Sequence, residues 1–212
     1  MTGCKMARNE ANEDKWNEHY EKSKSHVEEG NYVKAIEELE SAEEGRDLIY
    51  SDIGKSIAKV VKVWEALGDA YFQLADQGDE SDYPDRFDEY YYLYDLAIRY
   101  YEQIEVFILQ RTLLFQKDKK DPFENRELWH KIGCPFDIKQ LWRKLGRAHD
   151  NKARLAAWFP RYYYDYDNAF VRFSEAIKHL KKALDYYERS DDGSLSQIGD
   201  TAYKLLQEYK RS

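Results

Sequence analysis

The sequence predicts an all-α protein in which antiparallel helix pairs stack on one another. Its 212 residues include only 10 glycines and 4 prolines, the residues that most often interrupt helices. Apolar residues recur at helical spacing along most of the chain, and no segment has a convincing strand pattern. Two short phrases of sequence are also repeated, as described below. The helical pattern begins after residues 1–15, so we expect a flexible N-terminus followed by a single helical domain over 16–212.

Seven main helices are predicted, joined by short links except at 76–85 and 117–136. Gly30 supplies the first turn, and Asp47 and Asp137 are placed to cap the helices that follow them. The stretch 76–85 has the composition of a loop, and 117–136 is an irregular insertion with one short helix. In chain order, the predicted helices cover residues 20–29, 32–44, 48–74, 86–116, 138–159, 160–189 and 195–209.

Composition excludes several classes of protein. No run of about 18 apolar residues exists, so the sequence predicts no membrane-spanning helix. The first residues, MTGCKMARNEANEDK, lack the apolar stretch of a secretory signal. Cys4 and Cys134 are far apart and have no other thiol near them, so they indicate neither a disulfide framework nor a zinc site. We therefore expect a cytoplasmic protein.

Two phrases are repeated along the chain. Trp, Leu-Gly and a ring residue recur at the same spacing in WEALGDAY (64–71) and WRKLGRAH (142–149). A second phrase has small and large residues on one helix face, in AIEELESA (35–42), AIRYYEQI (97–104) and AIKHLKKA (176–183). Together they resemble the tetratricopeptide repeat, a helix-turn-helix unit of about 34 residues whose first helix carries the Trp-Leu-Gly phrase.

The resemblance implies a short, irregular solenoid of helical hairpins closed by a C-terminal capping helix. In that packing, a glycine on one helix lets the backbone of its neighbour approach closely. The family has about 16 residues between its Trp and its Ala, whereas Trp64 precedes Ala97 by 33 residues and Trp142 precedes Ala176 by 34. The second and third hairpins are therefore expected to be elongated.

The resemblance also implies where a ligand would bind. First helices of the family line a concave face, and the positions one and five residues after the Trp typically grip an extended peptide. Arg143 and Arg147, one turn apart, would hold a carboxylate with paired hydrogen bonds, whereas Glu65 and Asp69 stand where a carboxylate clamp would need Asn or Lys. A mixed-charge peptide or a folded partner fits better. The expected partner-binding residues are Tyr20, Lys24, Glu65, Asp69, Gln73, Arg143, Arg147 and Asn151.

The sequence thus predicts a non-catalytic scaffold or adaptor for a protein or peptide. One alternative is a nucleic-acid-associated protein that binds through the aromatic segment 111–161, which has 13 basic and 6 acidic residues although the whole chain has a net charge of -8. Asp165 and Asp167, beside the tyrosines that follow this segment, would repel phosphate. Another alternative is a self-assembling structural subunit, a homo-oligomer held by aromatic surface.

No catalytic, cofactor-binding or metal-binding residues are predicted. The stretch SDIGKS (51–56) ends like a phosphate-binding loop, but Ile49 stands where that loop needs its first glycine. Glu127 and His130 form a single Glu-x-x-His pair, whereas a di-iron bundle needs two such pairs. The five histidines show no metal-ligand spacing, and neither cysteine has an evident base partner. We therefore expect that the protein is not an enzyme.

Overall fold

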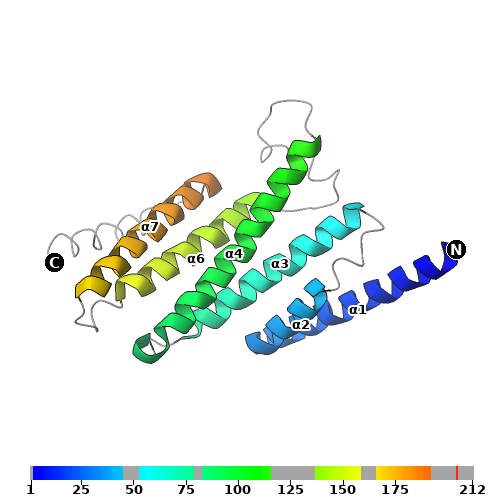
Figure 1. Ribbon diagram of the computed structural model, residues 1–212, viewed down its shortest axis with the longest axis horizontal. Coiled ribbons are helices and arrows are strands. Elements are labelled where there is room, and N and C mark those ends of the chain that lie inside the picture. Colours follow the sequence, from blue (N-terminus) through cyan, green and yellow to red (C-terminus); the bar gives the residue numbers. More distant parts are fainter. Residues whose placement is uncertain are drawn as a thin grey trace. The chain divides into compact units, whose positions relative to one another are not determined.

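The computed structural model describes residues 2–44, 53–78, 83–115, 137–158, 166–191 and 204, and the statements below concern these residues. Across these ranges the chain is helical and contains no strand, which confirms the all-α class. The helices are labelled in Figure 1. They are α1 (Thr2–Glu28), α2 (Tyr32–Glu44), α3 (Ile53–Asp76), α4 (Tyr83–Phe115), α6 (Ile138–Trp158) and α7 (Tyr166–Ser190). None of them is both long enough and apolar enough to cross a lipid bilayer.

The chain divides into two compact units. Unit 1 comprises Met1–Leu74 and Glu102–Phe136, and unit 2 comprises Ala75–Tyr101 and Asp137–Ser212. The boundaries fall inside α3 and α4, so each of these helices contributes to both units. The single domain expected over 16–212 stays a prediction.

Two helix boundaries confirm the sequence analysis closely. Helix α2 has the predicted bounds, Tyr32–Glu44. Helix α6 begins directly after Asp137, whose Oδ1 accepts hydrogen bonds from the backbone N–H groups of Lys139, at 3.0 Å, and Gln140, at 3.4 Å. A side-chain oxygen at this position satisfies donors that the first turn of a helix leaves without a partner.

The N-terminal part of the chain differs from the expected pattern. Helix α1 begins at Thr2, so residues 2–15, expected to be a flexible N-terminus, are helical. An apolar stripe was the signal for the predicted helices, and α1 is largely polar, so its helix-favouring residues gave no such signal. Helix α4 begins at Tyr83 but has non-helical backbone angles at Arg86 (φ -120°, ψ 16°), where the sequence analysis placed the start of the helix.

The turn between α1 and α2 follows from its glycine. Gly30 has φ = +72°, the left-handed conformation that glycine adopts without steric cost. Its N–H donates to the carbonyl of Val27 at 3.0 Å, and the N–H of Asn31 donates to the carbonyl of His26 at 2.8 Å, which is the Schellman pattern of a helix end. The turn lets α1 and α2 pack against each other as a hairpin within unit 1 (Figure 1).

The repeated phrases supply the core of unit 1. Ala35, Leu39 and Ala42 of α2 are each at most 1% exposed, and Ser23 of α1 takes the small position beside them. On α3, the four residues of the Trp-Leu-Gly-Tyr phrase are buried, Gly68 included. The buried faces of these helices are therefore the faces that the repeat pattern predicts.

Two aromatic side chains of α3 fix α2 beside it. The Nε1–H of Trp64 donates to Glu43 at 2.7 Å, and the hydroxyl of Tyr71 donates to Glu40 at 2.8 Å. Both rings are at most 8% exposed, so their polar atoms need partners within the protein. These two hydrogen bonds therefore satisfy buried polar groups and set the register between α2 and α3.

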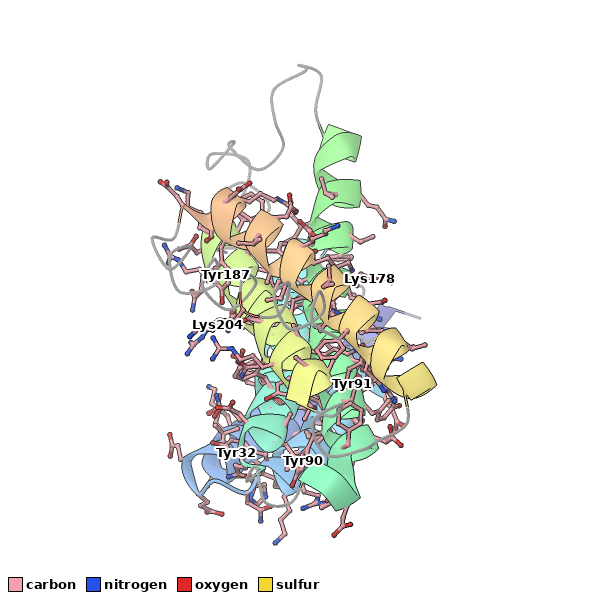
Figure 2. All side chains as sticks on the ribbon, turned by 90° about the vertical axis from the view of Figure 1, so that its left-hand side faces the viewer. Tyr32, Tyr90, Tyr91, Lys178, Tyr187 and Lys204 are labelled. Carbon is pink, nitrogen blue, oxygen red and sulfur yellow. The ribbon has the colours of Figure 1, made fainter. Side chains whose placement is uncertain are left out.

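In unit 2, α6 and α7 form the main helix pair. Its core is a cluster of small residues and rings, namely Ala153, Ala156, Ala157, Phe173, Ala176, Leu180, Ala183 and Tyr187. The glycine of α6 corrects one expectation. A Cβ on Gly146 would lie 2.9 Å from Cε1 of the Tyr187 ring, so this glycine makes room for an aromatic ring of the neighbouring helix rather than for its backbone. Tyr187 is labelled on α7 in Figure 2.

Several sequence predictions lie outside the described residues. These are the cap at Asp47, the insertion 117–136, the start of a helix at Pro160 and the C-terminal capping helix 195–209, of which only Lys204 is described, as helical. The resemblance to the tetratricopeptide repeat and the arrangement of the hairpins as a solenoid both stay predictions.

Candidate functional site

Four of the predicted partner-binding residues lie together in unit 1. Tyr20 and Lys24 come from α1, and Glu65 and Asp69 come from α3; we call these four residues the α1/α3 patch. Lys59 of α3 brings the two helices together, because its amine donates to Glu13 at 2.6 Å and lies 4.9 Å from the centre of the Trp16 ring. The charges of Glu65 and Asp69 act on the Tyr20 hydroxyl, so positions that the repeat pattern marks on two different helices lie near one another.

Tyr20 is the aromatic centre of the α1/α3 patch. Its ring stacks on Trp16 at 5.0 Å between centroids, and the amine of Lys24 lies 4.7 Å from its ring centre. Burial raises the pKa of the Tyr20 hydroxyl, Lys24 opposes this, and the carboxylates of Glu65 and Asp69 raise the pKa further. The side chain is half-buried, so part of the ring remains at the surface beside groups of both charges.

The remaining predicted residues lie elsewhere. Gln73 is exposed on α3, two turns beyond Glu65. Arg143 and Arg147 are exposed on α6, in unit 2. Asn151, two turns beyond Arg143, is bound within unit 2, because its amide nitrogen donates to Asp76 at 3.0 Å and to the hydroxyl of Tyr94 at 3.5 Å.

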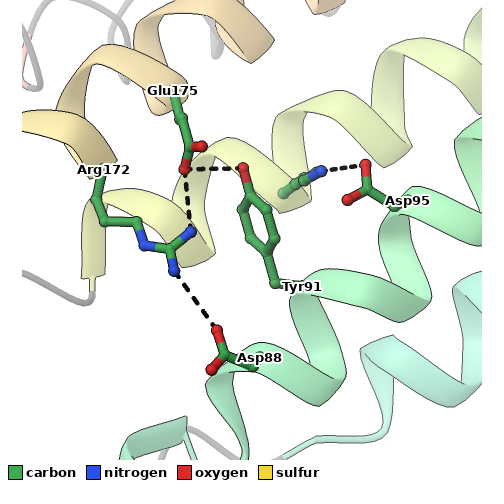
Figure 3. A network of polar contacts seen from close by, with 6 residues as sticks. Asp88, Tyr91, Asp95, Arg172 and Glu175 are labelled. Carbon is green, nitrogen blue, oxygen red and sulfur yellow. Dashed lines mark hydrogen bonds and ion pairs between the residues drawn. The ribbon is translucent and has the colours of Figure 1, made fainter. Parts of the chain in front are cut away.

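Unit 2 also contains a network of polar side chains that the sequence analysis did not predict (Figure 3). Arg172 of α7 donates to Glu175 at 3.1 Å and to Asp88 of α4 at 3.5 Å, and the hydroxyl of Tyr91 donates to the same Glu175 at 3.2 Å. Burial and the neighbouring Glu175 carboxylate raise the pKa of Tyr91 far above its usual range. The network joins α4 to α7 and keeps Tyr91 protonated.

Lys152 of α6 is a deeply buried charge among the described residues of unit 2. Its side chain is 3% exposed, its amine forms an ion pair with Asp95 of α4, and it lies 3.9 Å from the centre of the Tyr91 ring. Burial lowers the pKa of Lys152, and the hydrogen bond to Asp95 opposes that shift. A lysine with a lowered pKa is a group that catalysis uses, but this amine is covered by Tyr91 and held by Asp95, so a substrate carbonyl does not reach it in this arrangement.

The position of Lys152 also bears on the nucleic-acid hypothesis. Lys152 and Arg154 belong to the basic segment 111–161, through which that hypothesis has the chain bind nucleic acid. Lys152 is buried, and the guanidinium of Arg154 donates to Asp150 at 2.8 Å. Two of the basic groups in the segment 111–161 are therefore neutralised by carboxylates of the protein itself.

Two histidines meet between α6 and α7. The Nδ1 atoms of His149 and His179 are 2.9 Å apart, and their rings stack at 5.1 Å between centroids. Among the described residues, no group of three or more His, Cys, Asp or Glu side chains could hold a metal ion. The positive charges of Lys152 and Lys182, which act on this pair, would further oppose a bound cation.

The unpredicted contacts share one property. His149 is the ring residue of the second Trp-Leu-Gly phrase and is buried, but its partner His179 is on another helix. Asp95 and Lys152 likewise come from different helices. The repeat pattern held a signal that Lys152 is buried, because Lys152 follows the repeat residues of α6 on the buried side of that helix. A single sequence does not identify which acidic residue pairs with it.

Comparisons with models of protein families, with curated proteins and with solved structures find no match to this chain.

Proposed function

We propose that the chain is a non-catalytic scaffold that binds a protein or peptide through the surfaces of α1, α3 and α6. The observation that supports this most is the α1/α3 patch, because four residues selected from the repeat pattern alone lie on one surface of unit 1. A half-buried tyrosine ring bordered by charges of both signs resembles the hot spots of protein interfaces.

The composition of these surfaces favours a partner of mixed charge. Glu65 and Asp69 are one turn apart on α3, and the exposed guanidinium groups of Arg143 and Arg147 are one turn apart on α6. Paired guanidinium groups hold a carboxylate with two hydrogen bonds each, whereas paired carboxylates attract a cationic side chain. A partner with acidic and basic residues at separate positions would satisfy both surfaces.

Site-specific photo-crosslinking tests the proposal in the native cell extract. A photoreactive residue replaces Gln73, exposed on α3 two turns beyond Glu65, or Arg147, exposed within the α6 surface. In matched controls it replaces Glu37 of α2 or Lys181 of α7, which are exposed elsewhere. We expect one partner to be crosslinked from the first two positions and from neither control. Equal crosslinking from all four positions would remove these surfaces from the site.

Charge reversal then measures the contribution of each surface. For the partner found by crosslinking, Arg143→Glu with Arg147→Glu, or Glu65→Lys with Asp69→Lys, should weaken binding by at least about tenfold, which corresponds to 1.4 kcal/mol. The matched reversal Lys178→Glu with Lys181→Glu on the exposed face of α7 should leave the dissociation constant within about twofold. Far-UV circular dichroism checks that helicity is kept.

A further inference from the structure

The histidine pair in unit 2 is held in a fixed geometry. His149 of α6 is 1% exposed, and its Nδ1 lies 2.9 Å from Nδ1 of His179 on α7. Tyr186 stacks on His149, with 5.7 Å between centroids and 7° between ring planes. Tyr91 meets His179 edge to face at 6.3 Å. Rings on both sides therefore hold the two imidazoles against each other.

This geometry limits how many protons the pair can carry. At 2.9 Å, one hydrogen lies between the two Nδ1 atoms, donated by one ring to the lone pair of the other. One extra proton on the outer nitrogen of the donor ring leaves that hydrogen bond in place. A second extra proton must go to the acceptor Nδ1, and two N–H groups would then point at each other. The doubly protonated pair has to separate.

The surrounding charges also oppose protonation. Lys152 of α6 and Lys178 and Lys182 of α7 act on the pair with positive charge, whereas the carboxylate of Asp95 of α4 favours protonation of His179. Burial is the largest effect: it lowers the pKa of His149 to about 2 and that of His179 to about 4, from 6.5. The folded unit therefore keeps both rings neutral where separated rings would be charged.

We infer that the His149–His179 pair is an acid-sensitive latch, which keeps α6 and α7 packed while both rings are neutral and releases them when the rings take up protons. The direction in which pH changes the stability of the latch follows from the lowered pKa values of the two histidines. Above pH 6.5 the latch contributes its full stability, and this contribution is lost as the pH falls from 6.5 towards 4. The inference does not depend on the proposed function, although Arg143 and Arg147 are on the same α6 helix.

The size of the effect of pH on the opening equilibrium of the latch follows from proton linkage. Between pH 6 and pH 5, each histidine that is neutral in the closed pair and has a pKa of 6.5 when released raises the opening equilibrium about eightfold. Both together raise it about 60-fold.

Amide hydrogen exchange, corrected for the intrinsic effect of pH, measures this opening in the full chain. We expect exchange in α6 and α7 to rise about 60-fold from pH 6 to pH 5 in the native sequence. The variant His149→Asn with His179→Asn keeps an amide near each Nδ1 position but carries no titrating ring, and its exchange should rise less than about twofold. His19→Asn, which changes a histidine of α1 bonded to Glu38, should respond like the native chain.

A second measurement covers the case in which the double variant does not fold. Nuclear magnetic resonance of the native imidazoles follows each ring with pH. We expect His149 and His179 to stay neutral at pH 5.5 and to take up protons only as exchange in α6 and α7 rises. Either ring becoming charged near pH 6.5 with exchange unchanged would overturn the latch, as would an equal rise in the folded double variant.

Discussion

Replacing Gly146 of α6 tests whether a glycine of the repeated phrase is needed for helix packing. A Cβ at this position would lie 2.9, 3.0 and 3.1 Å from three carbons of the Tyr187 ring. Carbon atoms in contact prefer about 3.5 to 4.0 Å, so the ring or the helix has to withdraw by about 0.5 to 1 Å. Tyr187 is 4% exposed in the α6/α7 core and has little room to move.

Two opposing effects set the expected magnitude. Crowding a well-packed core costs about 1 to 3 kcal/mol, whereas Gly→Ala inside a helix gains about 1 kcal/mol. We therefore expect Gly146→Ala to lower the free energy of unfolding by about 1 kcal/mol. Gly146→Val adds two more methyl groups against the same ring and should cost about 3 kcal/mol or more.

Urea unfolding followed by far-UV circular dichroism measures these free energies, and two controls separate the effects. The difference between Arg147→Gly and Arg147→Ala gives the helix-propensity gain at the next, exposed residue of α6. Tyr187→Leu removes the ring, so Gly146→Ala should then stabilise, with a coupling energy of at least about 1 kcal/mol. If Gly146→Ala stabilises by the full propensity gain while Tyr187 is present, the packing argument is wrong.

Three further changes have expected outcomes in the same unfolding assay. Gly30→Ala should lower the free energy of unfolding by about 1 to 2 kcal/mol, because φ is +72° there, although a Cβ would meet no atom within 4 Å. Gly30→Asn should lower it less, and equal losses for both variants would contradict a backbone cause. Asp137→Ala should cost about 0.5 to 2 kcal/mol through loss of the α6 cap, and Asp137→Asn should keep most of it. Asp95→Asn should lower the free energy of unfolding by about 1 to 3 kcal/mol, because the buried Lys152 amine loses its counter-charge. Adding Lys152→Met to this variant should restore part of the stability, and a larger loss in the double variant would argue against the ion pair.

The repeat pattern predicted the helices and their buried faces well because both depend on nearby residues. Small and large residues three and four positions apart place Ala35 and Leu39 on one side of α2, and that side is buried. The cap at Asp137 and the turn at Gly30 likewise depend on a few consecutive residues. The same reasoning missed the first half of α1, because a polar helix has no apolar stripe to reveal it.

The candidate site was predicted in part for the same reason. The repeat register marked Tyr20 and Lys24 on one helix and Glu65 and Asp69 on another, and unit 1 brings them together. The register did not show that Asn151 is already bonded within unit 2. A position in a repeat indicates the face on which a side chain lies, whereas its hydrogen bonds depend on the helix that faces it.

The sequence by itself determined that the described part of this chain is helical, where α2 begins and ends, where α6 begins, and which helix faces are apolar. Only the tertiary structure decided that Gly146 accommodates the Tyr187 ring, that Asp95 neutralises Lys152, and that two histidines share a hydrogen bond. Backbone propensity, capping and helical spacing act over a few residues, so they can be read along the chain. Side chains from different helices meet only after those helices have packed, and their charges and pKa values are set by that packing.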